Sequence, residues 1–213
     1  LVWTNQKRSI TDWKAKRADR KNGMYLLCSD DGISWSELHS LPVLHSFVSS
    51  DSCPLGSVAF DTSPYLIKHQ DHFLYYGRIN TALDERRIYV RKSKDLISWD
   101  DPVSIKISNE TDNKFNKNYY NPVIFKQDNF VFMFTPYFEC CGTEKRYATQ
   151  GKTLLLKSIN GIDWSIIDSC LPHDGKYKYR VNEVLVENNL VNLFYRENIA
   201  YKHQNLISFI LEI

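Results

Sequence analysis

Three stretches of the chain each contain two short runs rich in apolar residues, joined by a polar turn. Their sequences are SPYLIKHQDHFLYYGR at residues 63–78, NPVIFKQDNFVFMFTP at 121–136 and VNEVLVENNLVNLFYR at 181–196. Short apolar runs that are rich in β-branched and aromatic residues and bounded by turn signals are consistent with β-strands. The Asp and Asn residues between the runs favour tight turns, because their side chains bond the local backbone. Each stretch is therefore predicted to form a β-hairpin.

A third strand is predicted after each hairpin, from the apolar runs RRIYVRKS at 86–93, KTLLLKS at 152–158 and LISFILEI at 206–213. Tyr, Phe, Val and Ile are frequent in the strand segments, and such residues favour strands. After the first of these runs, PVSIKI at 102–107 predicts a fourth strand. The repeating unit is thus about four antiparallel strands, with almost no helical periodicity.

A turn motif follows the third strand. It reads CSDDGISWSE at 28–37, KSKDLISWDD at 92–101 and KSINGIDWSI at 157–166. The tryptophans Trp35, Trp99 and Trp164 lie 64 and 65 residues apart, and this fixed period indicates an internal repeat. The Asp or Asn is expected to bond the turn backbone, the Gly to adopt a left-handed conformation, and the Trp to cover the seam between units. A catalytic role for the aspartates is the less favoured alternative.

Four-stranded antiparallel units repeated along a chain are typical of a β-propeller, in which each blade buries its faces against its neighbours. The predicted fold class is all-β, a β-propeller of four-stranded antiparallel blades. Residues 1–213 are expected to form one domain, with repeats near 24–50, 51–110, 111–175 and 176–213. The length supplies only about three and a third blades. Either residues 1–20 complete the last blade of a closed four-bladed ring, or the chain is a fragment of a longer propeller.

The composition argues against several kinds of partner and ligand. Of the 213 residues, 27 are basic and 25 acidic, so the chain lacks the cationic excess that favours nucleic acid or anionic lipid. No apolar run has the roughly 18 residues that a membrane helix needs. The five cysteines lack metal-ligand spacing and are expected to be buried packing residues. His69 and His72 flank a turn and are expected to be solvated, and neither a metal nor a cofactor is predicted.

The segment FDTSPYLIKHQDHFLYYGRINTALDERRIYVRKSKDLISWDDPV, residues 60–103, resembles the five-bladed β-propeller glycoside hydrolases, the superfamily around families 32, 43 and 68. The likeness lies in the acid and proline that open the blade, the aromatic second strand and the Ser-x-Asp-Leu-x-x-Trp run. Residues 119–138 and 153–164 continue it in the next unit. The resemblance, over roughly residues 24–213, implies a five-bladed fold that cleaves or binds sugars. Sialidases are the neighbouring alternative, although their repeated box is one residue longer.

By this resemblance, the catalytic carboxylates belong at the blade openings, where they converge on a central funnel. The openings carry Asp61, Asn121 and Glu183. Asp61 would be the base or nucleophile and Glu183 the general acid, whose pKa an apolar wall would have to raise. Asn121 stands where the family often has an orienting Asp, and it is assigned to substrate binding.

Three arginines and a tyrosine complete the expected site as further substrate-binding residues. Arg78 and Arg196 occupy matching places at the ends of second strands, Tyr120 precedes Asn121, and Arg180 lies near Glu183. The planar guanidinium suits the carboxylate of an acidic sugar, and a tyrosine ring can stack on a sugar ring. The structural alternative is that the arginines form salt bridges within a blade, Arg180 pairing with Glu183, while Asp61 caps a turn.

The sequence therefore predicts a carbohydrate as the ligand and a glycoside hydrolase-like activity that uses paired carboxylates. A non-catalytic propeller that binds carbohydrate or another protein is the alternative, and Asn121 favours it. The exposed strand edges of an incomplete ring would need a cover, and a homo-oligomer is one way to provide it.

Overall fold

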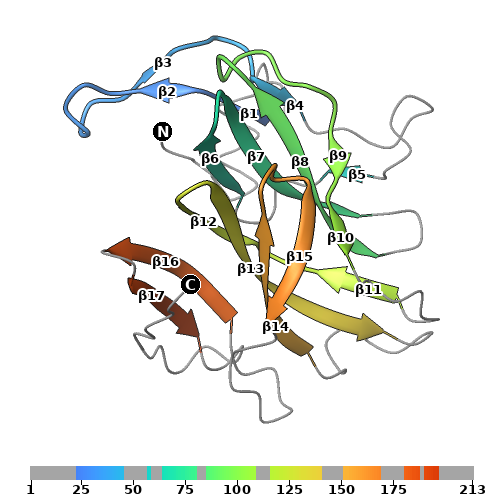
Figure 1. Ribbon diagram of the computed structural model, residues 1–213. Coiled ribbons are helices and arrows are strands. Elements are labelled where there is room, and N and C mark those ends of the chain that lie inside the picture. Colours follow the sequence, from blue (N-terminus) through green and yellow to red (C-terminus); the bar gives the residue numbers. More distant parts are fainter. Residues whose placement is uncertain are drawn as a thin grey trace.

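The computed structural model describes residues 23–45, 57–58, 64–80, 85–108, 116–140, 151–168, 180–187 and 190–196. All regular structure in these residues is β-strand, so the all-β fold class is confirmed for them (Figure 1). They form a series of sheets and not a closed ring. The third strand predicted at 206–213 lies outside the described residues.

The two largest sheets each contain one of the predicted hairpins. The first sheet has five strands, β5 (Ser57–Val58), β6 (Tyr65–His69), β7 (His72–Asn80), β8 (Arg86–Ser93) and β9 (Val103–Ser104). The second sheet has six strands, β10 (Lys106–Ser108), β11 (Asn116–Tyr119), β12 (Val123–Gln127), β13 (Phe130–Cys140), β14 (Gly151–Ser158) and β15 (Asp163–Asp168). Within each, the predicted four-stranded antiparallel meander is present, as β6 to β9 and as β12 to β15.

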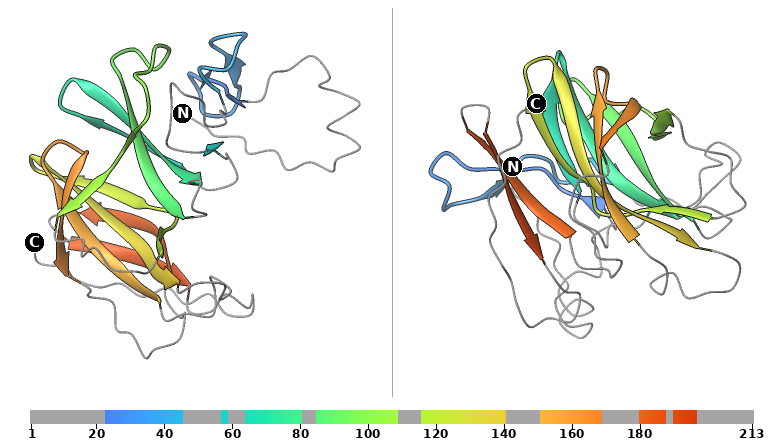
Figure 2. Two further views of the ribbon diagram at one scale, coloured as in Figure 1. Left: turned by 90° about the vertical axis from the view of Figure 1, so that its right-hand side faces the viewer. Right: turned by 60° about the horizontal axis from the view of Figure 1, so that its bottom comes forward.

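Smaller sheets lie on either side of these two in chain order. They are formed by β1 (Gly23–Met24) with β4 (Leu44–His45), β2 (Leu27–Cys28) with β3 (Ser36–Glu37), and β16 (Arg180–Glu187) with β17 (Leu190–Arg196). The last pair is the third predicted hairpin. The inner strands β6, β12 and β16 lie side by side, because β12 contacts both of the others (Figures 1 and 2).

The fourth strand predicted at 102–107 is divided between two sheets. Val103 pairs with Val90 in the first sheet, and the Ile105 N–H still donates to the Ile88 carbonyl. The next residue, Lys106, donates its N–H to the Ile162 carbonyl, and β10 then runs parallel to β15 in the second sheet. One strand therefore ties consecutive sheets together by backbone hydrogen bonds.

The cores of the protein are the seams between successive sheets. On β7, Leu74 and Tyr76 face the second sheet, whereas Tyr75 and Ile79 face the other way, toward β1 and β4. All four side chains are almost completely buried. A third cluster joins the opposite face of the second sheet to β16 and β17. Because each large sheet has apolar side chains on both faces, each needs a neighbour on both sides.

The three turn motifs have the same hydrogen bonds. In the second, Asp95 Oδ1 accepts the N–H groups of Ile97 and Ser98 at 2.8 and 2.7 Å, and the Trp99 ring donates to the Leu96 carbonyl at 3.1 Å. The first and third motifs repeat this pattern around Asp31 and Asn160. The two aspartates and Asn160 thus have the structural role that the sequence favoured.

The tryptophans of these turns differ in burial because their neighbours differ. Trp164 is 1% exposed and meets the Tyr76 ring of the preceding sheet edge-on at 6.1 Å, so it covers a seam as predicted. Trp99 packs beside Tyr75 at the seam with β1 and β4. Trp35 is 39% exposed.

Two expectations about individual side chains were wrong. His69 is only 4% exposed, and its Nε2 lies 2.6 Å from the Ile159 carbonyl, because the turn of the next sheet packs over it. Cys28 is exposed and unoxidised, with its Sγ 3.3 Å from Ser36 Oγ, because β2 and β3 form an outlying hairpin.

The left-handed glycines of the first and third turns should tolerate alanine differently. Gly32 and Gly161 have φ values of 73° and 76°. A Cβ on Gly32 would meet nothing within 4 Å, whereas one on Gly161 would lie 2.5 Å from Tyr76 Oη and 2.6 Å from Leu74 Cδ1. We expect Gly32→Ala to cost about 1 kcal/mol from backbone strain. Gly161→Ala should cost about 1–3 kcal/mol more, from overpacking, in urea unfolding. Equal losses of unfolding free energy in the two variants would contradict the close packing of Gly161 against Tyr76 and Leu74.

Acid should weaken the second turn. Hydrogen bonds from the Ser98 and Ile97 N–H groups lower the pKa of Asp95 from 3.8 to about 2. A carboxyl group with a lowered folded-state pKa stabilises the fold above its unfolded pKa, and that stability is lost as the pH falls toward the folded value. Asp95→Asn should keep the turn, as Asn160 does, and flatten the fall in unfolding free energy between about pH 4 and pH 2. Denaturant titrations at each pH measure this, and an equally steep fall in the variant would refute it.

Candidate functional site

The openings of the inner strands define one end of the sheets. The hairpin registers place Tyr65 opposite Tyr76 and Glu183 opposite Phe194, each four residues before the end of its inner strand. Val123, opposite Phe134, has the same place in β12. Tyr65, Val123 and Glu183 therefore occupy one level on three neighbouring strands, and we call them the opening tier.

Tyr65 and Glu183 are in direct contact across the opening tier. The Tyr65 hydroxyl donates a hydrogen bond of 2.8 Å to Glu183 Oε1, although the two residues are 118 positions apart. The Val184 N–H donates to the same oxygen at 3.3 Å. Tyr65 packs against both core clusters that flank β12. Burial, and next the Glu183 carboxylate, raise the pKa of Tyr65 above its usual range, so the phenol stays protonated and acts as the donor.

Glu183 does not have the surroundings that a general acid was expected to need. Its side chain is exposed, and the described residues do not enclose it in an apolar wall. Arg180, the alternative ion-pair partner, has a described backbone, opposite that of Arg196, but the side chains of both arginines lie outside the described residues. The described groups that contact the Glu183 carboxylate, the Tyr65 hydroxyl and the Val184 N–H, are thus uncharged hydrogen-bond donors.

Two of the three blade openings compared in the sequence, Asn121 and Glu183, are not level with each other. Asn121 lies two residues before Val123, which is level with Glu183. Between Val181 and Glu183 the strand pairing shifts, so the intervening residue bulges out of the ladder. Asp61 lies outside the described residues.

Three of the predicted substrate-binding residues lie close together. The Arg78 guanidinium lies over the Tyr120 ring, 5.5 Å from its centre, in a cation–π contact that joins the first large sheet to the second. Tyr120 is fixed through its backbone, since its N–H donates to the Pro136 carbonyl and its carbonyl accepts from Thr135 Oγ1, both at 3.0 Å. Asn121 follows with a φ of 36°, in the left-handed region that Asn tolerates better than most residues.

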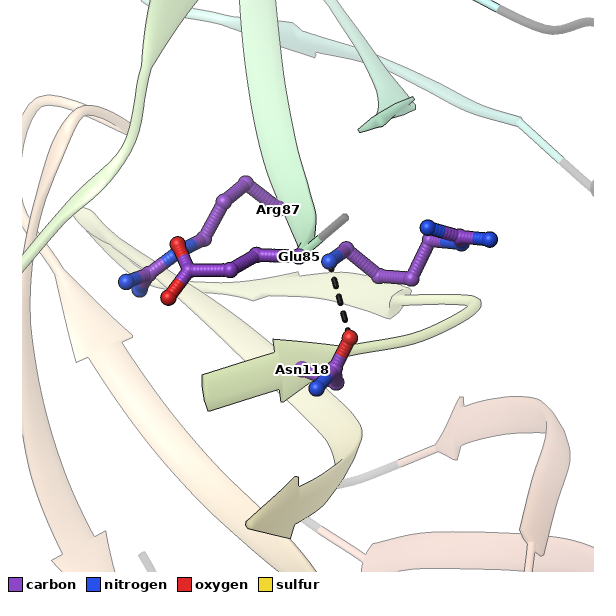
Figure 3. A network of polar contacts seen from close by, with 4 residues as sticks. Glu85, Arg87 and Asn118 are labelled. Carbon is purple, nitrogen blue, oxygen red and sulfur yellow. Dashed lines mark hydrogen bonds and ion pairs between the residues drawn. The ribbon is translucent and has the colours of Figure 1, made fainter. Parts of the chain in front are cut away.

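A second set of polar contacts, which was not predicted from the sequence, joins the two large sheets at the same end. The Arg86 N–H donates to Asn118 Oδ1 at 2.9 Å, and Asn118 is only 1% exposed (Figure 3). Arg87 forms an ion pair of 3.2 Å with Glu85 and lies over the Tyr119 ring at 5.6 Å. The salt bridge within a blade that was the alternative for the arginines is thus present for Arg87. Consecutive tyrosines, Tyr119 and Tyr120, each face an arginine of the preceding sheet.

Other kinds of site have little support in the described part of the chain. No group of three or more His, Cys, Asp or Glu side chains there could hold a metal ion. No described helix could span a membrane. The acids of the turn motifs lie at the end of the sheets opposite the opening tier. Asp95, for example, comes two residues after Ser93, which pairs with Phe73 at the start of β7.

The fold resembles those of carbohydrate-active propellers. A glycoside hydrolase described as putative, from Parabacteroides distasonis, matches with a TM-score of 0.56 over 87% of this chain, at 13% identity. A family 32 β-fructofuranosidase from Bombyx mori, in complex with sucrose, matches with 0.54 over 85% at 16% identity. A family 93 α-L-arabinofuranosidase from Fusarium graminearum, in complex with arabinobiose, matches with 0.51 over 82% at 15% identity. The expected resemblance to propeller glycoside hydrolases is confirmed at the level of the fold.

The similarity covers only part of those proteins. The chain spans 56%, 38% and 48% of the length of the three structures, respectively. No protein-family model matches the sequence. No curated protein matches it either.

Proposed function

We propose that this chain is a glycoside hydrolase-like protein that acts on an oligosaccharide or polysaccharide, with Glu183 and Asp61 as its carboxylate pair. The observation that carries the proposal is the fixed position of Glu183 in the opening tier, bound by Tyr65 from two sheets away. An exposed carboxylate held by a half-buried phenol is available to a ligand and is oriented before the ligand binds.

The neighbouring polar groups support a sugar as the ligand. Arg78, Tyr120 and Asn121 contribute a guanidinium, an aromatic ring and an amide at the opening end. Sugar sites combine such hydrogen-bonding groups with aromatic surfaces. Arg78 and Arg196, which hold equivalent hairpin positions, extend the proposal to acidic sugars. The fold neighbours are sugar-cleaving enzymes by name, which supports the same class of ligand.

One observation favours the second candidate, a propeller that binds carbohydrate or protein without cleaving it. Asn121 supplies an amide where an acid would assist catalysis, and an amide cannot transfer a proton as a carboxyl group does. The two candidates differ in whether Glu183 is needed for turnover or only lies beside the ligand.

Glu183→Gln should separate them. The amide keeps the shape and an oxygen that can accept from Tyr65, but it removes the charge, so we expect kcat to fall by about 10²–10⁴-fold with little loss of binding. The substrates are sucrose, arabinobiose and a panel of aryl glycosides and glycans. Glu187→Gln is the matched control, since Glu187 is an exposed acid four residues along the same strand, and it should retain full activity. Equal glycan binding by all three proteins, with no turnover by any, would instead establish the binding module.

A further inference from the structure

Two cations lie over a pair of tyrosine rings at the opening end of the two large sheets. Tyr119 of β11 pairs with Tyr137 of β13, and their ring centres are 5.1 Å apart. The Arg87 guanidinium lies over the first ring at 5.6 Å, and the Lys152 ammonium lies over the second at 5.5 Å. Both rings are buried, so they hold the cations in place but offer little surface for stacking on a sugar. We call these four residues the tyrosine row.

The two cations occupy equivalent positions in the two large sheets. Arg87 of β8 pairs with Ile79, and Lys152 of β14 pairs with Tyr137. Each of these pairs lies three residues beyond the level of the opening tier. A basic side chain at this level is therefore a feature that the two repeat units share, and it brings two cations together where the sheets meet.

The described acids leave the tyrosine row with a net positive charge. Glu85 pairs with Arg87 at 3.2 Å, and their side chains are 15% and 24% exposed. The described side chains provide no acidic partner for Lys152, which is exposed and contacts the Tyr137 ring. Because like charges repel, an anion bound beside both cations would be stabilised by each of them.

The acids of the described loops lie at the other end of the sheets and do not neutralise the tyrosine row. Apart from Lys94, the charged residues of the loops that join described strands at that end are Asp30, Asp31, Asp71, Asp95, Asp100, Asp101 and Asp128. Lys152 and Ser158 mark the two ends of β14, which are roughly 20 Å apart at the usual rise of a strand. That separation exceeds the Debye length of about 8 Å at physiological ionic strength. An approaching anion therefore meets a positive potential at the opening end.

We propose that the tyrosine row is a subsite for an anionic group, the carboxylate or the sulfate ester of an acidic glycan. This inference rests on the proposed function and deepens it, because it names the class of glycan. Arg87 presents a planar fork that suits two oxygens of the anion, and Lys152 presents a point charge. The row adjoins the residues assigned to the sugar, since Tyr119 precedes Tyr120, whose ring lies under the Arg78 guanidinium.

Dissociation constants for acidic oligosaccharides and for their uncharged forms test the proposal. The ligands are uronic-acid oligosaccharides with their methyl esters, and sulfated oligosaccharides with their desulfated forms, so the two sources of the anion are distinguished. We expect the wild type to bind an acidic form about 10-fold or more tightly than its uncharged form. Lys152→Gln and Arg87→Gln should each lose about 10-fold in affinity for the acidic form and nothing for the uncharged one.

Lys157→Gln is the matched control. Its ammonium lies over the Phe130 ring at 3.7 Å, on the same strand as Lys152 but at the other end of the sheet, and this variant should bind the acidic glycan as the wild type does. Equal affinity for acidic and uncharged forms, or unchanged affinity in both Lys152→Gln and Arg87→Gln, would overturn the inference. Tighter binding of a single-stranded RNA than of every acidic glycan would also overturn it, because the row would then serve a nucleic acid.

A titration with small anions separates this inference from the proposed function. The ¹⁵N signal of Arg87 Nε, assigned by its absence in Arg87→Gln, should shift saturably with glucuronate or inorganic sulfate and not with glucose. The shift should need a higher anion concentration in Lys152→Gln. If uncharged glycans are cleaved and no anion shifts this signal, the proposed function stands and the inference falls. A protein that binds and cleaves no glycan would refute the proposed function and the glycan as the source of the anion, while the titration would still decide whether the row binds anions.

Discussion

Burial of both faces of each large sheet is the constraint on which the rest of this structure depends. Tyr76 and Tyr75 are adjacent on β7, face opposite sides and are both almost completely buried. A single sheet cannot remove both faces from water, so the sheets must pack in series. The division of residues 103–108 between two sheets adds hydrogen bonds to that packing. Successive inner strands are thereby held side by side, and only then can Tyr65 reach Glu183 two sheets away.

Local patterns were sufficient to predict most of the fold. The three hairpins and two of the third strands follow from short apolar runs bounded by turn residues, and the structure has them at the predicted places. The left-handed turn position is occupied by Gly32, Gly161 and also Leu96, at a φ of 67°, so the backbone keeps its conformation even where glycine is missing. Strand exchange at Lys106 and the burial of His69 were not predicted, because both depend on the next sheet, about 55 to 90 residues along the chain.

The candidate site was only partly predictable for the same reason. Arg78, Tyr120 and Asn121 were selected from one blade opening and the preceding second strand, and the structure brings them together. Tyr65 was overlooked, because a tyrosine at the start of a strand is an ordinary strand residue. Counting back from the hairpin turns would have placed Tyr65 and Glu183 on one level. The bulge before Glu183 adds one residue to β16, so a residue-by-residue comparison of the blade openings does not reveal that Tyr65 and Glu183 are level.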